Sequence, residues 1–230
     1  MIKHYLKVAF RNLVKYKTQS LVSIIGLAVG FTCFALSVLW IRYEMTYDTF
    51  HKGAERIYMV RAHYTDIPEH ISNSTPYPLA AYLQEKMPEI EAKATTSIHQ
   101  NVKIRMENDE YEVVMAAADS AFMNFFHIQL LKGTVNFLKE NNPEIAVTEE
   151  FAKKLFGSED DALGKEMEVN GRSRQIGAIV SGWSRHSNIP YSVLVAARHS
   201  PRWKSGPEQL FIRVRAGMDM DTFWKKISTM

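Results

Sequence analysis

The sequence predicts an α+β protein in which an N-terminal amphipathic helix and one transmembrane helix precede a mixed α+β domain with βαβ and hairpin elements. Two observations support this class. Residues 18–41 form a run of 24 residues without a charge, and short β-rich segments later in the chain are separated by capped helical patterns and by turn residues. Because the strands do not follow a continuous βα repeat, α+β is favoured over α/β.

The positive charge of the chain gathers at its N-terminus. The whole sequence has 28 basic and 25 acidic residues, and 46% of its residues are hydrophobic. Residues 1–42 contain no acid, and their basic residues are Lys3, Lys7, Arg11, Lys15, Lys17 and Arg42. Such a local charge is not typical of a nucleic-acid-binding surface, so no nucleic-acid partner is expected.

Residues 1–17 are predicted to form a cytoplasmic or interfacial amphipathic helix. The basic residues at positions 3, 7, 11 and 15 recur every four residues, and an apolar row follows its own helical spacing. A helix of this kind lies along an anionic membrane surface, so membrane lipid is an expected partner. The alternative is a docking surface for a cytoplasmic partner such as a motor subunit.

Residues 18–42 are predicted to span the membrane. A helix rises about 1.5 Å per residue, so this segment is long enough for the hydrocarbon core. A cleaved signal peptide is the alternative, but its apolar segment is normally about 7 to 15 residues long. The basic residues before the segment and the aromatic Trp40 and Tyr43 near its end place the N-terminus in the cytoplasm and residues 44–230 outside.

Gly26 and Gly30 form a G-x-x-x-G pair in the predicted span, and this spacing lets a second helix approach closely. Coincidence is an equal alternative, because glycine is common in such segments. A packing seam would imply further spans or a homodimer partner. Cys33, the only cysteine, lies in the same segment, so the external domain depends on its core for stability.

Residues 43–55, which we call the neck, connect the predicted span to an external domain at residues 56–230. On a continuous helix, one face of the neck would carry Glu44, Asp48, His51 and Glu55. Asp48 and His51 then have the spacing of metal ligands, but such sites take further ligands from other helices. Gly53 also weakens a helix here. A solvated, hydrogen-bonded neck is therefore favoured, and no metal or other cofactor is expected.

The first half of the external domain is predicted to contain a βαβ unit and a hairpin. Its strands are residues 56–64 and 91–98, and the helix between them begins near Pro78 and ends at Met87. Residues 101–106 and 111–118 flank a polar turn and predict the hairpin. Asp119 is expected to cap a helix that ends at Gly133, with a core-facing row of Phe122, Phe125, Phe126 and Leu130.

The second half has the stronger local signals. Thr148 is an N-cap residue ahead of Glu149 and Glu150, and Gly157 closes the short helix that follows. Asn170-Gly171, the preferred type I′ pair, joins two predicted strands. Two more strands at 192–198 and 209–217 and a helix at 220–228 complete the domain.

The chain lacks the common motifs of catalysis. It contains no Walker or dinucleotide-binding glycine loop and no H-E-x-x-H or C-x-x-C motif, so we expect it not to be an enzyme. Residues 182–186 resemble a nucleophile elbow, but His186 replaces the last glycine, which the strained turn needs. A loop serine at Ser184 is therefore favoured over a hydrolase nucleophile.

Several segments together resemble the MacB-type and FtsX-like ABC-transporter permeases, in the first span and the MacB-type periplasmic core domain. The neck is similar to that family's acidic-x-x-Tyr-Asp-x-Phe-His pattern followed by Glu-Arg-Ile-Tyr. The matching neck residues are Glu44, Tyr47, Asp48, Phe50, His51 and Arg56. Residues 118–133, 144–157 and 162–172 also match in order. The loop at 181–197 departs from the family, and only Arg185, Ser187 and Asn188 are loosely similar to its pattern.

The resemblance implies a non-catalytic permease subunit, here as a fragment, in the cell inner membrane. The neck would transmit motion from a separate ATP-binding subunit through the span to the external domain. Expected partners are that ATPase, further permease spans or a homodimer partner, and a periplasmic adaptor. The work would be efflux or a mechanical action on an envelope substrate. A single-span sensor or ligand-binding module remains the alternative.

Overall fold

The computed structural model describes residues 2–63, 71–106, 109–139, 141–183, 186–198, 202–203 and 208–228. The chain divides into two compact units, Met1–Tyr47 and Asp48–Met230. Each unit is described by itself below.

The first unit consists of two helices, α1 (Ile2–Lys15) and α2 (Lys17–Glu44). Tyr16 interrupts them, because its backbone (φ −108°, ψ 55°) is not helical. Within the described part of the chain, α2 is the one helix long and apolar enough to cross a membrane. The hydroxyls of Thr32 and Ser37 donate to the carbonyls of Ala28 and Cys33 at 2.8 Å, so both are satisfied inside the helix.

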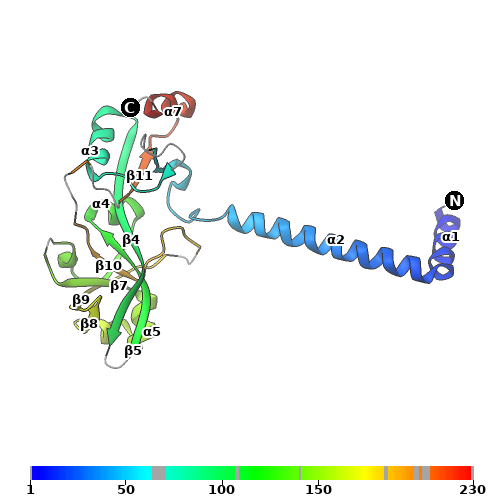
Figure 1. The fold of residues 1–230 in the computed structure, drawn as a ribbon, viewed down its shortest axis with the longest axis horizontal. Coiled ribbons are helices and arrows are strands. Elements are labelled where there is room, and N and C mark those ends of the chain that lie inside the picture. Colours follow the sequence, from blue (N-terminus) through cyan, green and yellow to red (C-terminus); the bar gives the residue numbers. More distant parts are fainter. Residues whose placement is uncertain are drawn as a thin grey trace. The chain divides into compact units, whose positions relative to one another are not determined.

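The second unit, Asp48–Met230, contains the predicted external domain together with the second half of the neck. We use the name external domain for this whole unit from here on, and it is built on one large sheet (Figure 1). Its strands in spatial order are β1 (Ile57–Val60), β11 (Gln209–Val214), β4 (Ile90–Met106), β5 (Asp109–Ala118), β10 (Val193–Ala196), β7 (Glu144–Thr148), β9 (Arg172–Val180) and β6 (Leu130–Gly133). A separate short pair consists of β2 (Ala62–His63) and β3 (Ile71–Ser72).

One strand closes part of this sheet into a ring. β8 (Glu166–Val169) pairs with β4 on one side and with β9 on the other. The strands β4, β5, β10, β7, β9 and β8 therefore form a closed six-stranded barrel, from which β11 and β1 extend beyond β4, and β6 beyond β9. Closure leaves these six strands without a free edge between them.

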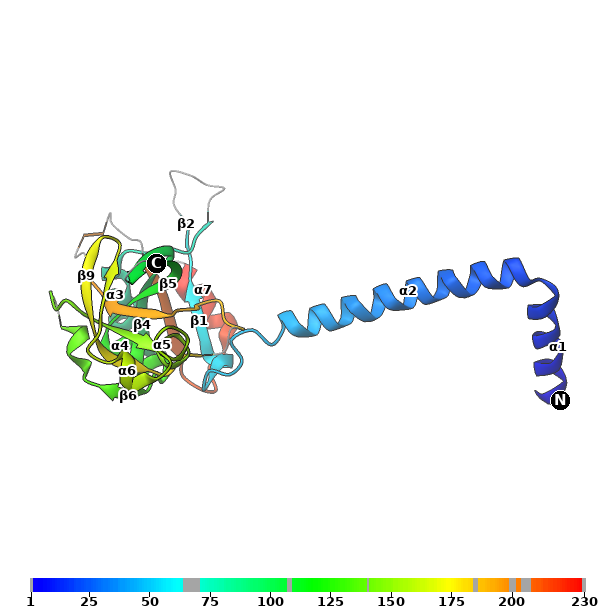
Figure 2. The ribbon, with the colours of Figure 1, turned by 90° about the horizontal axis from the view of Figure 1, so that it is seen from below.

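The helices cover the sheet in separate places. They are the 3₁₀ helix η1 (Ala54–Arg56), α3 (Tyr77–Lys86), α4 (Ser120–Phe126), the 3₁₀ helix η2 (Val135–Leu138), α5 (Glu149–Phe156), α6 (Glu159–Ala162) and α7 (Met220–Ser228). α3 and α7 pack with β11 around Phe223 at one end of the domain (Figure 1). α5 and α6 lie beside one another near β6, where Lys132 reaches Asp160 (Figure 2).

β4 contributes to all three apolar cores. Its first residue, Ile90, packs in the core under α3 and α7, and its later residues Val102 and Ile104 fill the barrel. A third core gathers α4, Ala94 of β4 and the outer faces of β5, β7 and β9 around Phe122. A register shift between His99 and Val102 marks the change from one part of β4 to the other.

The α+β class is confirmed, and the strongest local predictions are confirmed with it. The Thr148 hydroxyl accepts from the Phe151 amide, and α5 ends at Gly157 with φ 82°. Asn170 and Gly171 have φ 48° and 76°, as a type I′ hairpin requires. β1 and β4 pair with opposite sides of β11, so the predicted βαβ unit is present with β11 inserted between its strands.

Three element predictions are wrong in detail. The helix after Asp119 ends at Phe126, because His127 adopts a left-handed conformation (φ 56°) and caps it. Leu130 and Gly133 instead begin and end β6, where Leu130 is 38% exposed. The segments 91–98 and 101–106 form one strand, β4, and the segment 56–64 is divided at Arg61 into β1 and β2.

Candidate functional site

The chain enters the external domain through a tight series of turns. α2 ends at Glu44, and Asp48 has a left-handed backbone (φ 55°). The Asp48 amide donates to the carbonyl of His186 at 3.2 Å. Gly53, also left-handed (φ 76°), turns the chain into η1 and β1. The helical face that would carry Asp48, His51 and Glu55, the less favoured alternative, does not form, because the turns break the helical spacing.

The Asp48 carboxylate holds a loop from the far end of the sequence. The Ser187 hydroxyl donates to Asp48 Oδ1 at 2.5 Å, and the Asn188 side-chain amide donates to Oδ2 at 2.9 Å. The Asn188 backbone amide lies 3.2 Å from Oδ2 and 3.3 Å from Oδ1. We call this arrangement of Asp48, Ser187 and Asn188 the clasp. Because its acceptor is ionised, its hydrogen bonds are stronger than neutral ones.

An aromatic cluster lies beside the clasp. The His51 ring packs against Phe50, Phe126 and Trp183, with centroid distances of 4.2, 4.9 and 4.6 Å. The Trp183 indole nitrogen donates to the carbonyl of Ile189 at 2.8 Å, which fixes the same loop from its other side. His51 is thus surrounded by apolar rings, and only 8% of it is exposed, so the predicted solvated neck is wrong for this residue.

Burial lowers the pKa of His51 below its ordinary value of 6.5, and the nearby His127 lowers it further. Asp48 opposes this shift, because its Oδ1 lies 3.9 Å from His51 Nε2. Nε2 is buried and has no hydrogen-bond partner among the described residues. The neutral imidazole is therefore the favoured form at neutral pH.

The clasp borders a cavity of about 540 Å³. Asp48, His51 and Asn188 form part of its wall, and Arg61 and Phe126 form another part. Arg61 Nε donates to Asn73 Oδ1 at 2.9 Å, which orients the guanidinium group. The cavity combines apolar and polar lining, as ligand pockets do, but nothing in its lining selects one ligand chemistry.

Arg56 joins the three strands at the entry to the domain. Its Nη1 donates to Glu91 Oε2 at 2.6 Å and to the carbonyl of Val214 at 3.1 Å. Glu91 belongs to β4 and Val214 ends β11, and Arg56 itself precedes β1. One side chain therefore ties these three strands together.

The structure places the remaining predicted residues as follows. Phe50 is 44% exposed beside His51. In the helical unit, Tyr47 packs edge-on against Tyr43, and Glu44 is exposed at the end of α2. Lys7, Arg11 and Lys15 are exposed on α1, and nothing lies within 4 Å of a side chain built at Gly26 or Gly30. Lys3 lies on α1, and Ser184 and Arg185 lie outside the described residues.

Ser187 and Asn188 are the main partners that sequence reasoning did not place in the site. Both are loosely similar to the permease family's loop, but nothing in the sequence links them to Asp48. Trp183 and Phe126 are likewise distant in sequence from His51. In the described part of the chain, no group of three or more His, Cys, Asp or Glu side chains could hold a metal ion.

The fold is shared with solved domains of membrane proteins. A domain of a protein assigned as a permease in Porphyromonas gingivalis is 21% identical over 78% of this chain and 84% of that one, with a TM-score of 0.64. The periplasmic region of MacB from Actinobacillus actinomycetemcomitans is 12% identical over 74% and 79% of the two chains, with a TM-score of 0.52.

A third solved structure is the extracellular domain of the noncanonic ABC-type transporter YknZ from Gram-positive bacteria. It is 10% identical over 71% of this chain and 86% of that one, with a TM-score of 0.53. At these identities the three likenesses show a common fold. No curated protein matches the chain.

The sequence itself matches a family model over nearly its whole length. The model describes the MacB-like periplasmic core domain, and it matches residues 20–230. Together with the apolar helix α2, this match indicates a membrane-anchored protein with an extracytoplasmic domain. The chain belongs to the MacB-like periplasmic core domain family.

Proposed function

We propose that the chain is a non-catalytic permease component of an ABC transporter, coupled through α2 to a separate ATPase. In this proposal the N-terminus lies in the cytoplasm, α2 crosses the inner membrane, and the external domain performs export or mechanical work on an envelope substrate. The family match supports the permease assignment, and solved relatives include a MacB and an ABC-type transporter. The basic residues ahead of α2 support the orientation.

The clasp is the observation that carries the proposed coupling. Only three residues separate the last residue of α2, Glu44, from Asp48. Asp48 is in turn held by Ser187 and Asn188 rather than by its sequence neighbours alone. A displacement of α2 would therefore be passed to the loop at 186–189 and to Trp183, because little slack chain precedes the clasp.

The proposed partners follow from the helical unit. The exposed Lys7, Arg11 and Lys15 suit anionic lipid or a cytoplasmic ATPase. Gly26 and Gly30 leave room for another helix, from further permease spans or from a second copy. A periplasmic adaptor would contact the external domain.

The test uses the full-length protein purified from its native membranes in a mild detergent. We expect an ATP-binding subunit to co-purify and to hydrolyse ATP. Trp183 would report the coupling, after replacement of the other three tryptophans by phenylalanine. ATP should change its fluorescence in the parent protein, and Asp48→Ala should abolish that change while the ATPase still co-purifies.

Asp109→Ala is the matched control, because Asp109 is an exposed carboxylate at the start of β5. It should leave the ATP-dependent signal unchanged. Absence of any ATPase from a complete membrane preparation would contradict the permease proposal. A ligand that stabilises the external domain in such a preparation would then favour the single-span sensor.

A further inference from the structure

The barrel of the external domain is apolar inside and polar at one mouth. Its interior is filled by inward-facing residues such as Val113 and Met115 of β5, Val193 of β10 and Ile176 of β9. At the end of the barrel where β9 begins and where β5 and β10 end, a cavity of about 470 Å³ opens. Barrel mouths and cavities of this size are common ligand sites.

Three arginines line this mouth. Arg172 and Arg174 lie on β9 in alternating positions with Ile176, so they continue the inward-facing row of that strand. Arg198 follows β10 and reaches the same cavity. Ser97 and His99 of β4 add polar groups beside them. Two strands of the barrel and the segment after β10 therefore contribute groups that can bind an anion.

These arginines have no carboxylate partner among the described residues. Arg174 Nη1 donates weakly to the carbonyl of Asn142 at 3.4 Å, and no other polar contact of the three guanidinium groups is observed in that part of the chain. Glu144 is the one acidic residue of the lining, and its carboxylate lies against Gly177, where a side chain at 177 would come within 2.5 Å of Oε2. The mouth thus has an excess of positive charge.

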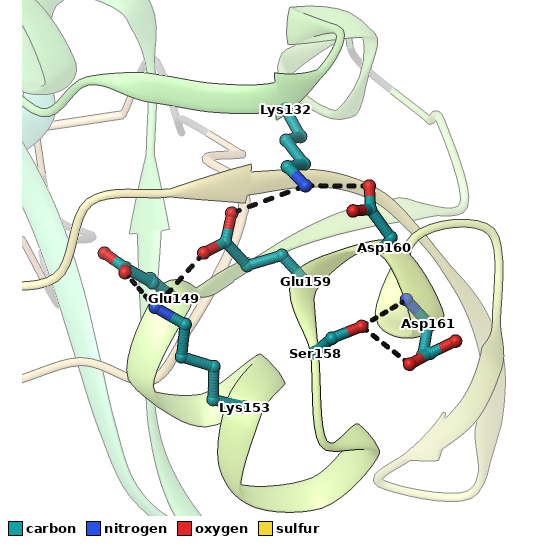
Figure 3. Close-up of polar contacts among 7 residues, drawn as sticks. All are labelled: Lys132, Glu149, Lys153, Ser158, Glu159, Asp160 and Asp161. Atoms are coloured by element: carbon teal, nitrogen blue, oxygen red, sulfur yellow. Dashed lines mark hydrogen bonds and ion pairs between the residues drawn. The ribbon is translucent and has the colours of Figure 1, made fainter.

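Two lysines elsewhere in the domain, in contrast, are paired with carboxylates. Near α5 and α6, Lys132 Nζ lies 2.7 Å from Asp160 and 3.8 Å from Glu159 (Figure 3). Lys153 pairs with Glu149 and lies 3.3 Å from Glu159. The paired lysines have their counter-charges within the protein, whereas the arginines of the mouth converge on a cavity without them. Converging like charges repel one another unless an anion lies between them.

We propose that the barrel mouth binds a small polyanion through Arg172, Arg174 and Arg198. Guanidinium groups form paired hydrogen bonds with carboxylate and phosphate oxygens, so the ligand carries several groups of one of these kinds. Met115, Val169 and Val195 form an apolar floor for its carbon skeleton. This inference does not depend on the proposed coupling to an ATPase.

The experiment titrates the full-length protein, in nanodiscs of zwitterionic phosphatidylcholine, with inorganic pyrophosphate and separately with citrate. Calorimetry at about 0.1 M salt, where exposed charges are screened beyond about 10 Å, measures the binding. We expect saturable binding of at least one probe at one site per chain. Tighter binding of pyrophosphate would identify phosphate as the preferred group, and tighter binding of citrate would identify carboxylate.

The double variant Arg172→Gln/Arg174→Gln should weaken binding at least about tenfold, because two guanidinium pairs are lost. Arg198→Gln, outside the strands, is a second variant that should weaken it less and cannot disturb the β8–β9 hairpin. Lys132→Gln/Lys153→Gln removes the same charge from paired lysines and should leave affinity unchanged. An equal loss in this control, or no saturable binding of either probe, would overturn the proposal.

Discussion

The Ser187 hydroxyl donates a hydrogen bond to the Asp48 carboxylate at 2.5 Å, although 139 positions separate the two residues in the chain. Ser187 is buried, and its oxygen also accepts from the Ile189 amide at 3.1 Å. Asp48, the first residue of the external domain, is thus bound to the loop that precedes β10. This contact makes the clasp a structural element of the domain and also the point where we expect force to enter.

Asp48→Ala should destabilise the external domain by about 2 kcal/mol, because several hydrogen bonds to a charged acceptor are lost. For a domain of this size the melting temperature should fall by about 4 to 8 °C. Asp48→Asn should destabilise the domain less than Asp48→Ala, because asparagine tolerates the left-handed backbone. Part of the loss should remain, because the Asn188 donors would then face the amide group of the new side chain. Thermal unfolding followed through Trp183 fluorescence measures both, with Asp109→Ala as the unaffected control.

The stability of the aromatic cluster should decrease at acidic pH. The folded-state pKa of His51 is lowered by burial, so the unfolded chain binds more protons as the pH falls below about 6.5. The contribution of the neutral His51 ring to the stability of the folded domain is fully present above that pH, and it is lost as the pH falls through the folded-state pKa. Asp48 weakens the effect and His127 strengthens it. Melting temperatures between about pH 7.5 and pH 5 should show the decrease.

His51→Phe should remove this part of the pH dependence, because phenylalanine fills the same apolar space without titrating. His63→Gln, at an exposed position of β2, is the control and should retain the decrease. Identical pH profiles for His51→Phe and the parent protein would show that another group is responsible.

Gly133→Ala should be among the most destabilising single changes in β6. A side-chain carbon at this position would lie 2.2 Å from the carbonyl oxygen of Gly177, and the backbone is left-handed (φ 82°). Gly164 has nearly the same backbone (φ 80°) but nothing within 4 Å. Gly164→Ala should therefore cost only about 1 kcal/mol, and Gly133→Ala about 3 kcal/mol or more. Denaturant unfolding of the two variants compares them directly.

Arg56→Ala should cost about 1 kcal/mol and loosen the entry of β1 into the sheet. The Arg56 and Glu91 side chains are 30% and 45% exposed, so solvent screening reduces the value of their ion pair. The lost bond to the Val214 carbonyl adds a smaller amount. Amide exchange in β1 and β11 should increase in this variant. Arg105→Ala, which removes a more exposed pair with Glu110, should leave that exchange unchanged.

The proposed orientation can be tested with a single introduced cysteine. In a Cys33→Ser background, Glu112→Cys should react with a membrane-impermeant maleimide added to spheroplasts, because residue 112 is exposed on the external domain. Lys7→Cys should react only after the membrane is permeabilised. Labelling of Lys7→Cys in intact spheroplasts would place the N-terminus outside.

Local features of the fold could be predicted because their signals lie within a few residues. The Thr148 cap, the Gly157 stop and the Asn170-Gly171 turn each depend on neighbouring positions alone. The end of α4 could not be predicted, because His127 adopts the left-handed conformation that glycine or asparagine usually adopts at the end of a helix. The apolar Leu130 continues the helical spacing of the preceding phenylalanines, although the helix has already ended at Phe126.

The candidate site depends on contacts between distant segments, and no sequence spacing encodes these. Asp48 and His51 have the spacing of metal ligands on one helix. In the structure Asp48 instead binds Ser187 and Asn188, and His51 is buried against Trp183. The barrel was missed for the same reason, since β8 must pair with both β4 and β9 to close it. Each strand could be recognised, but not its partners.

The order of the strands also constrains how the domain folds. β1, the first strand of the sheet along the chain, pairs with β11, with Ile57 opposite Arg213. β10 lies between β5 and β7 and comes later in the chain than either. β1, β4 and β5 therefore have unpaired edges until the last strands of the chain are in place. Complete pairing of this sheet therefore requires β11, and a chain in which β11 is not yet in place exposes strand edges that favour aggregation.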